Sequence, residues 1–315
     1  MALDRNLLNR LMAAEYPGRG TRPAPAREQF RRFTQKEFSA ADLAERFHEH
    51  TQFTPRSAGV GDESTAALWE SETLRFARRR APPDYRGRES VSLPPPADSL
   101  GVDATDALGR SPPWNCSGAG LSRQQASTLL HYACGVPDRP DDERASTGDE
   151  PASTGDDIDR RTYPSTSGGF PIEPYLAVVN GGEGLDRGLY FYAARDHALR
   201  RVCAGHDEFV EAIATAFADA RFDVDEAAAC PVLAGAFWRA KARYGPRGYR
   251  LALVEAGHVM QNVRVVASAM GLASVPCASV REKRLESLFD ADGVDESVAY
   301  AGAVGVPDDA LGGSR

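Results

Sequence analysis

The longest helical pattern in the chain runs from Gly248 to Leu272, where apolar residues cover almost every side of the helix. A helix that is apolar all round is typical of a protein interior, so we expect it at the centre of the fold. Its polar exceptions include Glu255, His258 and Asn262, which fall within roughly 60° of one another around the helix axis. This polar seam either caps neighbouring backbone groups or meets another subunit, or it forms a wall of a ligand site, and the periodicity alone does not decide between the structural and the ligand-binding role.

Gly257 lies in the middle of the same predicted helix. A glycine in a helix interior costs roughly 1 kcal/mol relative to alanine. We therefore expect Gly257 to serve a close approach, either of another helix or of a flat ring.

Several apolar runs predict strands. Tyr175–Val179 and Leu189–Ala193 flank the glycine-rich turn GGEGLDRG, and together they predict a hairpin. Residues 231–240 and 298–307 are further apolar runs that predict strands. Helices and strands mix without strict βαβ alternation, which indicates an α+β fold rather than a doubly wound sheet.

Shorter helices are predicted at Ser39–His50, Ser64–Arg80, Leu121–Cys134 and 206–219. The third has Ser122 as its candidate N-cap and Gly135 at its C-terminal stop. The fourth, HDEFVEAIATAFAD, has the apolar spacing of an amphipathic surface helix.

Residues 1–100 are rich in arginine and proline, and we place a boundary between a helical and loop-like extension (1–100) and the main domain (101–315) near residue 100. The stretch APPDYRGRESVSLPPPADS has prolines too dense for a helix or a central strand. Within the main domain, 138–161 contains the near-duplicate heptads ASTGDEP and ASTGDDI without any apolar period, so we predict a mobile acidic insertion.

Composition excludes several classes of function. A net charge of −8 argues against non-specific nucleic-acid binding. No apolar run of about 18 residues predicts a membrane span, and the N-terminus does not resemble a signal peptide. Five scattered cysteines without CxxC spacing favour reduced thiols and a cytoplasmic protein. The spacing of His197, Cys203 and His206 matches no structural zinc pattern, so no metal is predicted.

The most distinctive stretch is YPSTSGGFPIEPYLAVVN, from Tyr163 to Asn180. It is neither GxxxxGK[ST] nor GxGxxG, and it precedes a strand instead of joining a strand to a helix, which disfavours a phosphate cradle. Turn chemistry explains Gly168 and Gly169 but leaves the cluster of hydroxyls beside them unexplained. A second cluster, Phe237–Arg250, is basic and aromatic, and is either a solvated cationic loop or an edge that faces an anion or substrate.

These segments resemble the SagB/ThcOx-type dehydrogenases of the nitroreductase-like flavoprotein superfamily. The resemblance covers about residues 105–307 and rests on YPSTSGGFPIEPYLAVVN, DRGLYFYAARDHALRRV, RYGPRGYRLALVEAGHVMQNVRVVASAMGL and VAYAGAVGVP, in that order. It implies an α+β nitroreductase-like flavin fold, with a central, mainly antiparallel sheet flanked by helices. It also implies a homodimer with FMN at the interface, and in the peptide-tailoring members oxidation of thiazolines and oxazolines to thiazoles and oxazoles.

The resemblance also implies site residues. Arg110 and Ser111 match the start of an Arg-Ser motif that binds the flavin phosphate, and arginine suits that task. The loop expected against the isoalloxazine ring comprises Ser165, Ser167, Gly168 and Gly169. The helix segment expected to face the flavin comprises Glu255, Ala256, Gly257 and Asn262.

Two departures from the family pattern matter. The second arginine usual a few residues after Arg110 is missing, and Trp114 or Asn115 stands near its place. The Lys-Tyr pair of the azoline oxidases is replaced by Arg243-Tyr244, with Lys241 two residues earlier. Arginine stays protonated and cannot replace lysine as a base, so Tyr244 is the candidate for proton handling.

Three functions therefore stay open. The leading one is an FMN-dependent oxidoreductase of this family that acts on a modified peptide, with peptide-modifying partner enzymes. The second is a general nitroreductase-like enzyme that uses NAD(P)H on small electrophiles. The third is a non-catalytic flavin-binding partner in a peptide-modification complex, which the lost arginine and the altered Lys-Tyr pair favour.

Overall fold

The structure is a computed structural model, and it describes residues 43–52, 85, 87–110, 114–137, 161–165, 169–218, 220 and 222–308. The chain divides into two compact units, Met1–Gln52 and Phe53–Arg315. In the first unit, helix α3 (Leu43–His50) confirms the second half of the helix predicted at Ser39–His50. The helix predicted at Ser64–Arg80 and residues 138–160 of the predicted acidic insertion lie outside the described residues.

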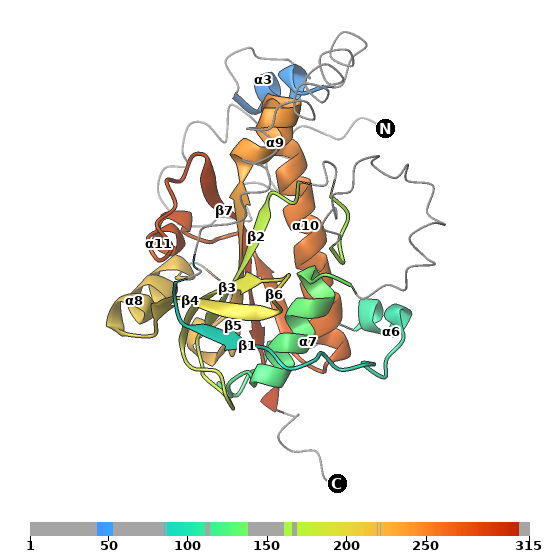
Figure 1. Ribbon diagram of the computed structural model, residues 1–315, viewed down its shortest axis with the longest axis vertical. Coiled ribbons are helices and arrows are strands. Elements are labelled where there is room, and N and C mark those ends of the chain that lie inside the picture. The colour runs from blue at the N-terminus through green and yellow to red at the C-terminus, as the bar shows by residue number, and fades with distance from the viewer. Residues whose placement is uncertain are drawn as a thin grey trace, which may run out of the picture. The chain divides into compact units, whose positions relative to one another are not determined.

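The second unit is built on a seven-stranded sheet in which every neighbouring pair of strands is antiparallel (Figure 1). In spatial order the strands are β1 (Ser90–Ser92), β4 (Ala198–Ala204), β3 (Gly188–Ala193), β2 (Ile172–Val178), β5 (Ala229–Ala236), β7 (Glu296–Gly305) and β6 (Ala273–Cys277). The predicted hairpin is confirmed, with Tyr175 opposite Phe191 in the β2–β3 ladder.

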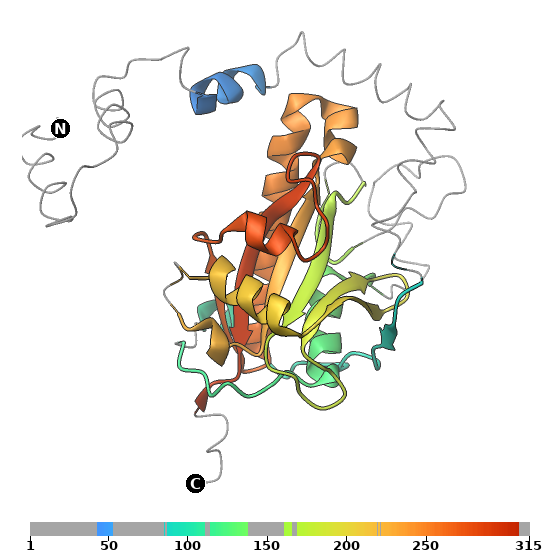
Figure 2. The same ribbon diagram turned by 90° about the vertical axis from the view of Figure 1, so that its left-hand side faces the viewer.

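Helices cover both faces of the sheet, so its central strands are apolar on both sides (Figure 2). On β2, Leu176 packs into the cluster formed with α7 (Arg123–Cys134) and α10 (Pro246–Ala269). The flanking Tyr175 and Ala177 pack into the opposite cluster, formed with α8 (Asp207–Ala216) and α11 (Glu282–Glu286). Successive side chains of β2 thus point to opposite faces of the sheet and pack into two different cores.

Three predicted helices of this unit lie among the described residues, and all three are confirmed. Helix α7 begins with a capping box, because the Ser122 hydroxyl accepts from Gln125 N–H while the Gln125 side chain accepts from Ser122 N–H. Helix α10 is the long central helix, and α8 is the amphipathic one. The structure adds α6 (Ala104–Gly109) and a 3₁₀ turn at Val224–Glu226.

The strand predicted over 231–240 is wrong in its last four residues. Strand β5 ends at Ala236, and helix α9 (Phe237–Tyr244) begins at the next residue. The apolar run continues across the change, because Phe237 and Ala240 are buried under α10 as well. Hydrophobicity therefore gives no sign of where the strand becomes a helix. The basic cluster is likewise a helical hairpin, α9 followed by α10, and not a loop.

Two glycines permit this helical hairpin. Gly245 joins α9 to α10 with φ +55°, a backbone region that other residues adopt at a cost. At Gly248, a Cβ atom would lie 2.2 Å from the carbonyl oxygen of Ala240, so the first turn of α10 rests directly on the backbone of α9.

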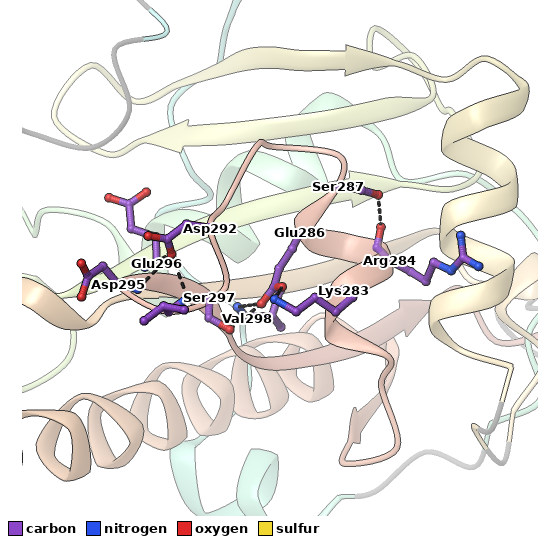
Figure 3. Close-up of polar contacts among 10 residues, drawn as sticks. Lys283, Arg284, Glu286, Ser287, Asp292, Asp295, Glu296, Ser297 and Val298 are labelled. Carbon is purple, nitrogen blue, oxygen red and sulfur yellow. Dashed lines mark hydrogen bonds and ion pairs between the residues drawn. The ribbon is translucent and has the colours of Figure 1, made fainter.

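The loop between α11 and β7 is closed by carboxylates (Figure 3). Asp292 Oδ1 accepts backbone N–H bonds from Val294, Asp295 and Glu296 at 2.8–3.0 Å. Glu286, on α11, accepts from Val298 N–H and from the Ser297 hydroxyl. These contacts fix the start of β7 beside the start of α9, where Phe237 N–H donates to Asp295 O.

The two interior glycines of α10 make a matched pair for a stability test. Gly248→Ala is expected to destabilise the fold by about 1–3 kcal/mol, because the new methyl group overlaps the α9 backbone. Gly257→Ala is expected to be neutral or to stabilise by up to about 1 kcal/mol, since nothing lies within 4 Å of its Cβ position. Urea unfolding of both variants measures the difference. Equal stability of the two would contradict the close α9–α10 contact.

Candidate functional site

The segment before β2 lies against the middle of α10 through one hydroxyl. The Ser165 side chain hydrogen-bonds the Glu255 carboxyl, and Ser165 Oγ accepts the backbone N–H of Phe170 at 3.3 Å. Phe170 has φ +42°, a left-handed conformation that costs a non-glycine residue roughly 1–2 kcal/mol. The turn is therefore strained, and Ser165 stabilises it from inside.

Asn262 lies about two turns after Glu255 on α10 and connects the same segment to a second helix. Its side-chain amide donates to the carbonyl oxygens of Ala133, on α7, at 3.1 Å and of Thr162 at 3.3 Å. Arg161 donates to Cys134 O at 3.5 Å. Asn262 thus uses its two N–H groups to hold backbone, and contact between its Oδ1 and a cofactor stays a prediction.

Glu255 is a buried carboxyl with an unused oxygen. Its side chain belongs to a residue only 3% exposed, and Oε1 has no hydrogen-bond partner among the described residues. Burial raises the pKa of Glu255 to about 7, although the hydrogen bond from Ser165 lowers it. A buried polar atom without a partner is costly, and one that adjoins a loop of hydroxyls and glycines is suited to meet a polar ligand.

Sequence reasoning did not single out the ion pair beside this segment. Arg239, on the first turn of α9, donates from Nη2 to Glu173 on β2 and from Nη1 to Phe170 O at 3.3 Å. Both side chains are buried, and burial raises the pKa of Glu173 against the lowering effect of Arg239. Glu173 lies in the glycine-rich stretch and Arg239 in the basic, aromatic cluster. Because 66 positions separate them, no local sequence pattern predicts their pairing.

Helix α9 also carries the predicted catalytic residues, all C-terminal to Arg239. Lys241 Nζ lies 2.9 Å from Asp295 Oδ1, in the loop of Figure 3. The Arg243 guanidinium lies 5.2 Å from the ring centroid of Tyr244, a cation–π contact. Both Arg243 and Tyr244 are half-buried at the end of the helix.

The predicted phosphate-binding residue, Arg110, contacts a different part of α10. Arg110 follows α6, is exposed, and its carbonyl oxygen accepts from the Ser268 hydroxyl at 3.5 Å. Ser268 comes thirteen residues after Glu255, which is about 20 Å along a helix axis. Within one chain the structure therefore does not bring Arg110 next to the Ser165–Glu255 contact. Ser111, Ser167 and Gly168 lie outside the described residues.

Of the three remaining predicted residues, the neighbours Ala256 and Gly257 differ in burial. Ala256 is buried in the core between α10 and the sheet. Gly257 is exposed, and a Cβ there would meet no atom within 4 Å. Because both lie inside an unbroken helix, their N–H groups are donated within that helix. Gly169 lies half-buried beside Phe170, in the turn that Ser165 stabilises.

Six of the seven strands (β2 to β7), the long helix α10 and the segment before β2 lie in a region that matches a known family pattern. Residues 161–306 match the model of the Nitroreductase family. This match covers somewhat less than half of the chain. The predicted α+β nitroreductase-like fold is confirmed, including the antiparallel sheet between helices.

Two curated relatives match part of the chain. One is the Methanocaldococcus jannaschii protein MJ1384, which is named as a nitroreductase, with 27% identity over 41% of this chain and 63% of that protein. The other is the trifolitoxin-processing protein TfxB of Rhizobium leguminosarum bv. trifolii, with 28% identity over 47% of this chain and 40% of that protein. The alignments thus span less than two thirds of either relative.

Two solved structures share the nitroreductase fold. A protein of Anabaena variabilis that is named as a nitroreductase has a TM-score of 0.60 and 19% identity, over 86% of this chain and 48% of that one. A chain of the E. coli microcin synthetase McbBCD complex, with truncated pro-MccB17 bound, has a TM-score of 0.50 and 20% identity, over 85% and 98%. In the described part of this chain, no helix has the length and apolarity needed to span a membrane.

The raised pKa of Glu255 predicts how stability depends on pH. Its folded pKa of about 7 exceeds the unfolded value of about 4.3, so the native state binds the proton more tightly and loses stability as pH rises through this range. Glu255→Gln removes that loss. At pH 8 the variant is expected to be about 2–4 kcal/mol more stable than the wild type, with little difference at pH 4.5.

Urea unfolding at both pH values measures this effect. Glu211→Gln, at an exposed position of α8, is the matched control and should shift neither value. A Glu255→Gln variant whose stability follows the wild type at all pH values would show that the carboxyl is ionised and satisfied.

Proposed function

We propose that this protein is an FMN-dependent oxidoreductase of the SagB/ThcOx type, which oxidises thiazoline or oxazoline rings of a ribosomal peptide to thiazoles or oxazoles. The observation that carries the proposal is the contact between Ser165 and Glu255. It joins the hydroxyl- and glycine-rich loop to the EAGHVMQN segment of α10, although the two are far apart in sequence.

The residues at this contact fit a flavin ring. An isoalloxazine ring is flat and carries hydrogen-bonding groups along one edge, so it needs small residues beside its face and polar groups at its rim. The sequence from Ser165 to Gly169 offers small residues, and Oε1 of Glu255, which has no hydrogen-bond partner in the described part of the chain, supplies a buried polar group. The match to the Nitroreductase family supports a flavin as the cofactor class.

Bound FMN would supply the acceptor for the hydride that leaves the azoline ring. The chain's own residues would bind and orient. Arg110 would neutralise the phosphate, while Ser165 and Gly169 would define the position of the ring edge. Glu255 holds a proton over part of the physiological pH range, since burial raises its pKa to about 7.

Aromatisation of an azoline removes a second hydrogen as a proton, which needs a base. Tyr244 is proposed to handle this proton, because Arg243 stays protonated. Lys241 is proposed to act with them only after it leaves Asp295, with which it is paired. The Arg243 guanidinium, stacked on the Tyr244 ring, would hold the phenol in place.

A homodimer would complete the site. Leu253 and Val254, at 39% and 51% exposure, lie near Gly257 on the outer face of α10. Such an apolar face on a central helix suits a second copy. A homodimer would also explain why Arg110 and Glu255 lie roughly 20 Å apart along α10 in one chain, because Arg110 of one subunit could approach Glu255 of the other. The similarity to TfxB supports a peptide substrate and partner enzymes of peptide modification.

A second candidate is a nitroreductase-like enzyme that uses NAD(P)H on small molecules, which the similarity to MJ1384 favours. A non-catalytic flavin-binding partner is the third, favoured by Arg243 in place of the lysine.

The phosphate assignment predicts a selective loss. Arg110→Ala should weaken FMN binding about tenfold or more, since a charge-assisted contact is lost, and should leave riboflavin binding unchanged. Fluorescence titration with both flavins measures this. Arg123→Ala, at another exposed arginine, is the control. Equal weakening of FMN and riboflavin would remove Arg110 from the phosphate site.

The reaction assignment predicts which donor reduces the cofactor. An azoline-containing peptide should bleach the flavin absorbance under anaerobic mixing, and Tyr244→Phe should slow this step about a hundredfold, a typical loss for a proton-transferring group. Rapid bleaching by NADPH, with no response to the peptide, would favour the second candidate. FMN binding with no reduction by either would favour the third.

A further inference from the structure

Arg239 is a buried cation that joins three elements. It leaves the first turn of α9, donates Nη2 to Glu173 on β2, and donates Nη1 to Phe170 O in the turn before β2. The side chains of Arg239 and Glu173 are 8% and 4% exposed, so the pair is shielded from water.

Charge pairing alone is a weak reason for such a pair. Removing two charges from water is costly, and a well-packed apolar pair of similar volume is often as stable. The guanidinium offers a rigid planar fork whose separate branches bond a carboxylate and a carbonyl, a fixed geometry that the compact ammonium group of lysine lacks. Here the second branch goes to the carbonyl of Phe170, the residue with φ +42°.

Both backbone groups of Phe170 are therefore held by side chains. Its N–H is accepted by Ser165 Oγ, and its carbonyl accepts from Arg239. Because Ser165 also bonds Glu255, a continuous path runs from Glu255 through Ser165 and Phe170 to Arg239 and Glu173. The path connects α10 to the turn, and the turn to α9 and β2.

Helix α9 also carries Tyr244, the residue proposed to handle the proton. Tyr244 lies five residues after Arg239 on the same short helix. A shift of Arg239 would thus move the turn that carries Ser165 and the helix that carries Tyr244 relative to each other.

We propose that Arg239 is a positioning residue of the flavin site, which acts through the Phe170 carbonyl to hold Ser165, Phe170 and α9 in one arrangement. This inference rests on the proposed function, because the loop's role in cofactor binding does. It adds a residue for which neither the loop motif nor the helix motif gives a role.

Three variants separate positioning from charge compensation. Arg239→Met alone leaves Glu173 buried without its partner and is expected to melt well below the wild type. The double variant Arg239→Met with Glu173→Leu removes both charges and should recover most of that melting temperature. Arg239→Lys keeps a cation beside Glu173 but loses the fork. Arg123→Met, at an exposed site, controls for loss of an arginine.

The readouts are the melting temperature without cofactor, the FMN dissociation constant, and the visible spectrum of the bound flavin. If Arg239 positions the loop, both the double variant and Arg239→Lys bind FMN about tenfold or more weakly, despite a recovered or retained fold. The flavin bands of whatever remains bound should shift, because its polar surroundings change.

Wild-type FMN affinity and spectrum in the folded double variant would overturn the proposal, since the pair would then only balance buried charge. Weak binding by Arg239→Lys and the double variant, with normal binding by Arg123→Met, would support it. No FMN binding by the wild type would overturn the proposed function and this inference with it, which is distinguishable from failure in the variants alone.

Discussion

The buried carboxyl of Glu255 is the group on which the surroundings of the candidate site depend. It lies in the middle of α10, on the buried side of the helix. Among the described residues, only Ser165 bonds it. A carboxyl in such a place either holds a proton or needs a further partner, since an isolated buried charge is too costly. Both outcomes suit a site that binds a polar ring and handles protons.

The burial of Glu255 is linked to the conformation of the turn before β2. Ser165 bonds Glu255 and also accepts the backbone N–H of Phe170, which has a strained, left-handed conformation. The strain is balanced by hydrogen bonds of Phe170 to two side chains, Arg239 on α9 and Ser165. Asn262, on α10, anchors Thr162 at the start of the turn to α7. Strain that is over-determined in this way is typical of functional sites. The antiparallel sheet provides the rigid base, because β2 pairs with β5 from Ile172 onward and with β3 from Tyr175 onward.

Sequence periodicity was sufficient for the elements with strong patterns. The long apolar run of α10, the capping residues of α7 and the glycine-rich hairpin of β2 and β3 each have a local cause, and each was predicted. Strand β4 was missed because Arg200 and Arg201 interrupt its apolar run. The change from β5 to α9 was missed because burial continues across it. The loop and helix motifs of the site were recognisable locally, whereas the pairing of Arg239 with Glu173 is a product of the fold alone.

The central claim is that a flavin ring lies against Glu255. Infrared difference spectroscopy of the protein with and without FMN tests it most directly, because a protonated carboxyl has a C=O stretch separate from the amide bands. At pH 6 the account predicts a difference signal in that region on FMN binding, absent in Glu255→Gln and retained in Glu211→Gln. FMN binding without a carboxyl signal that depends on Glu255 would contradict the account.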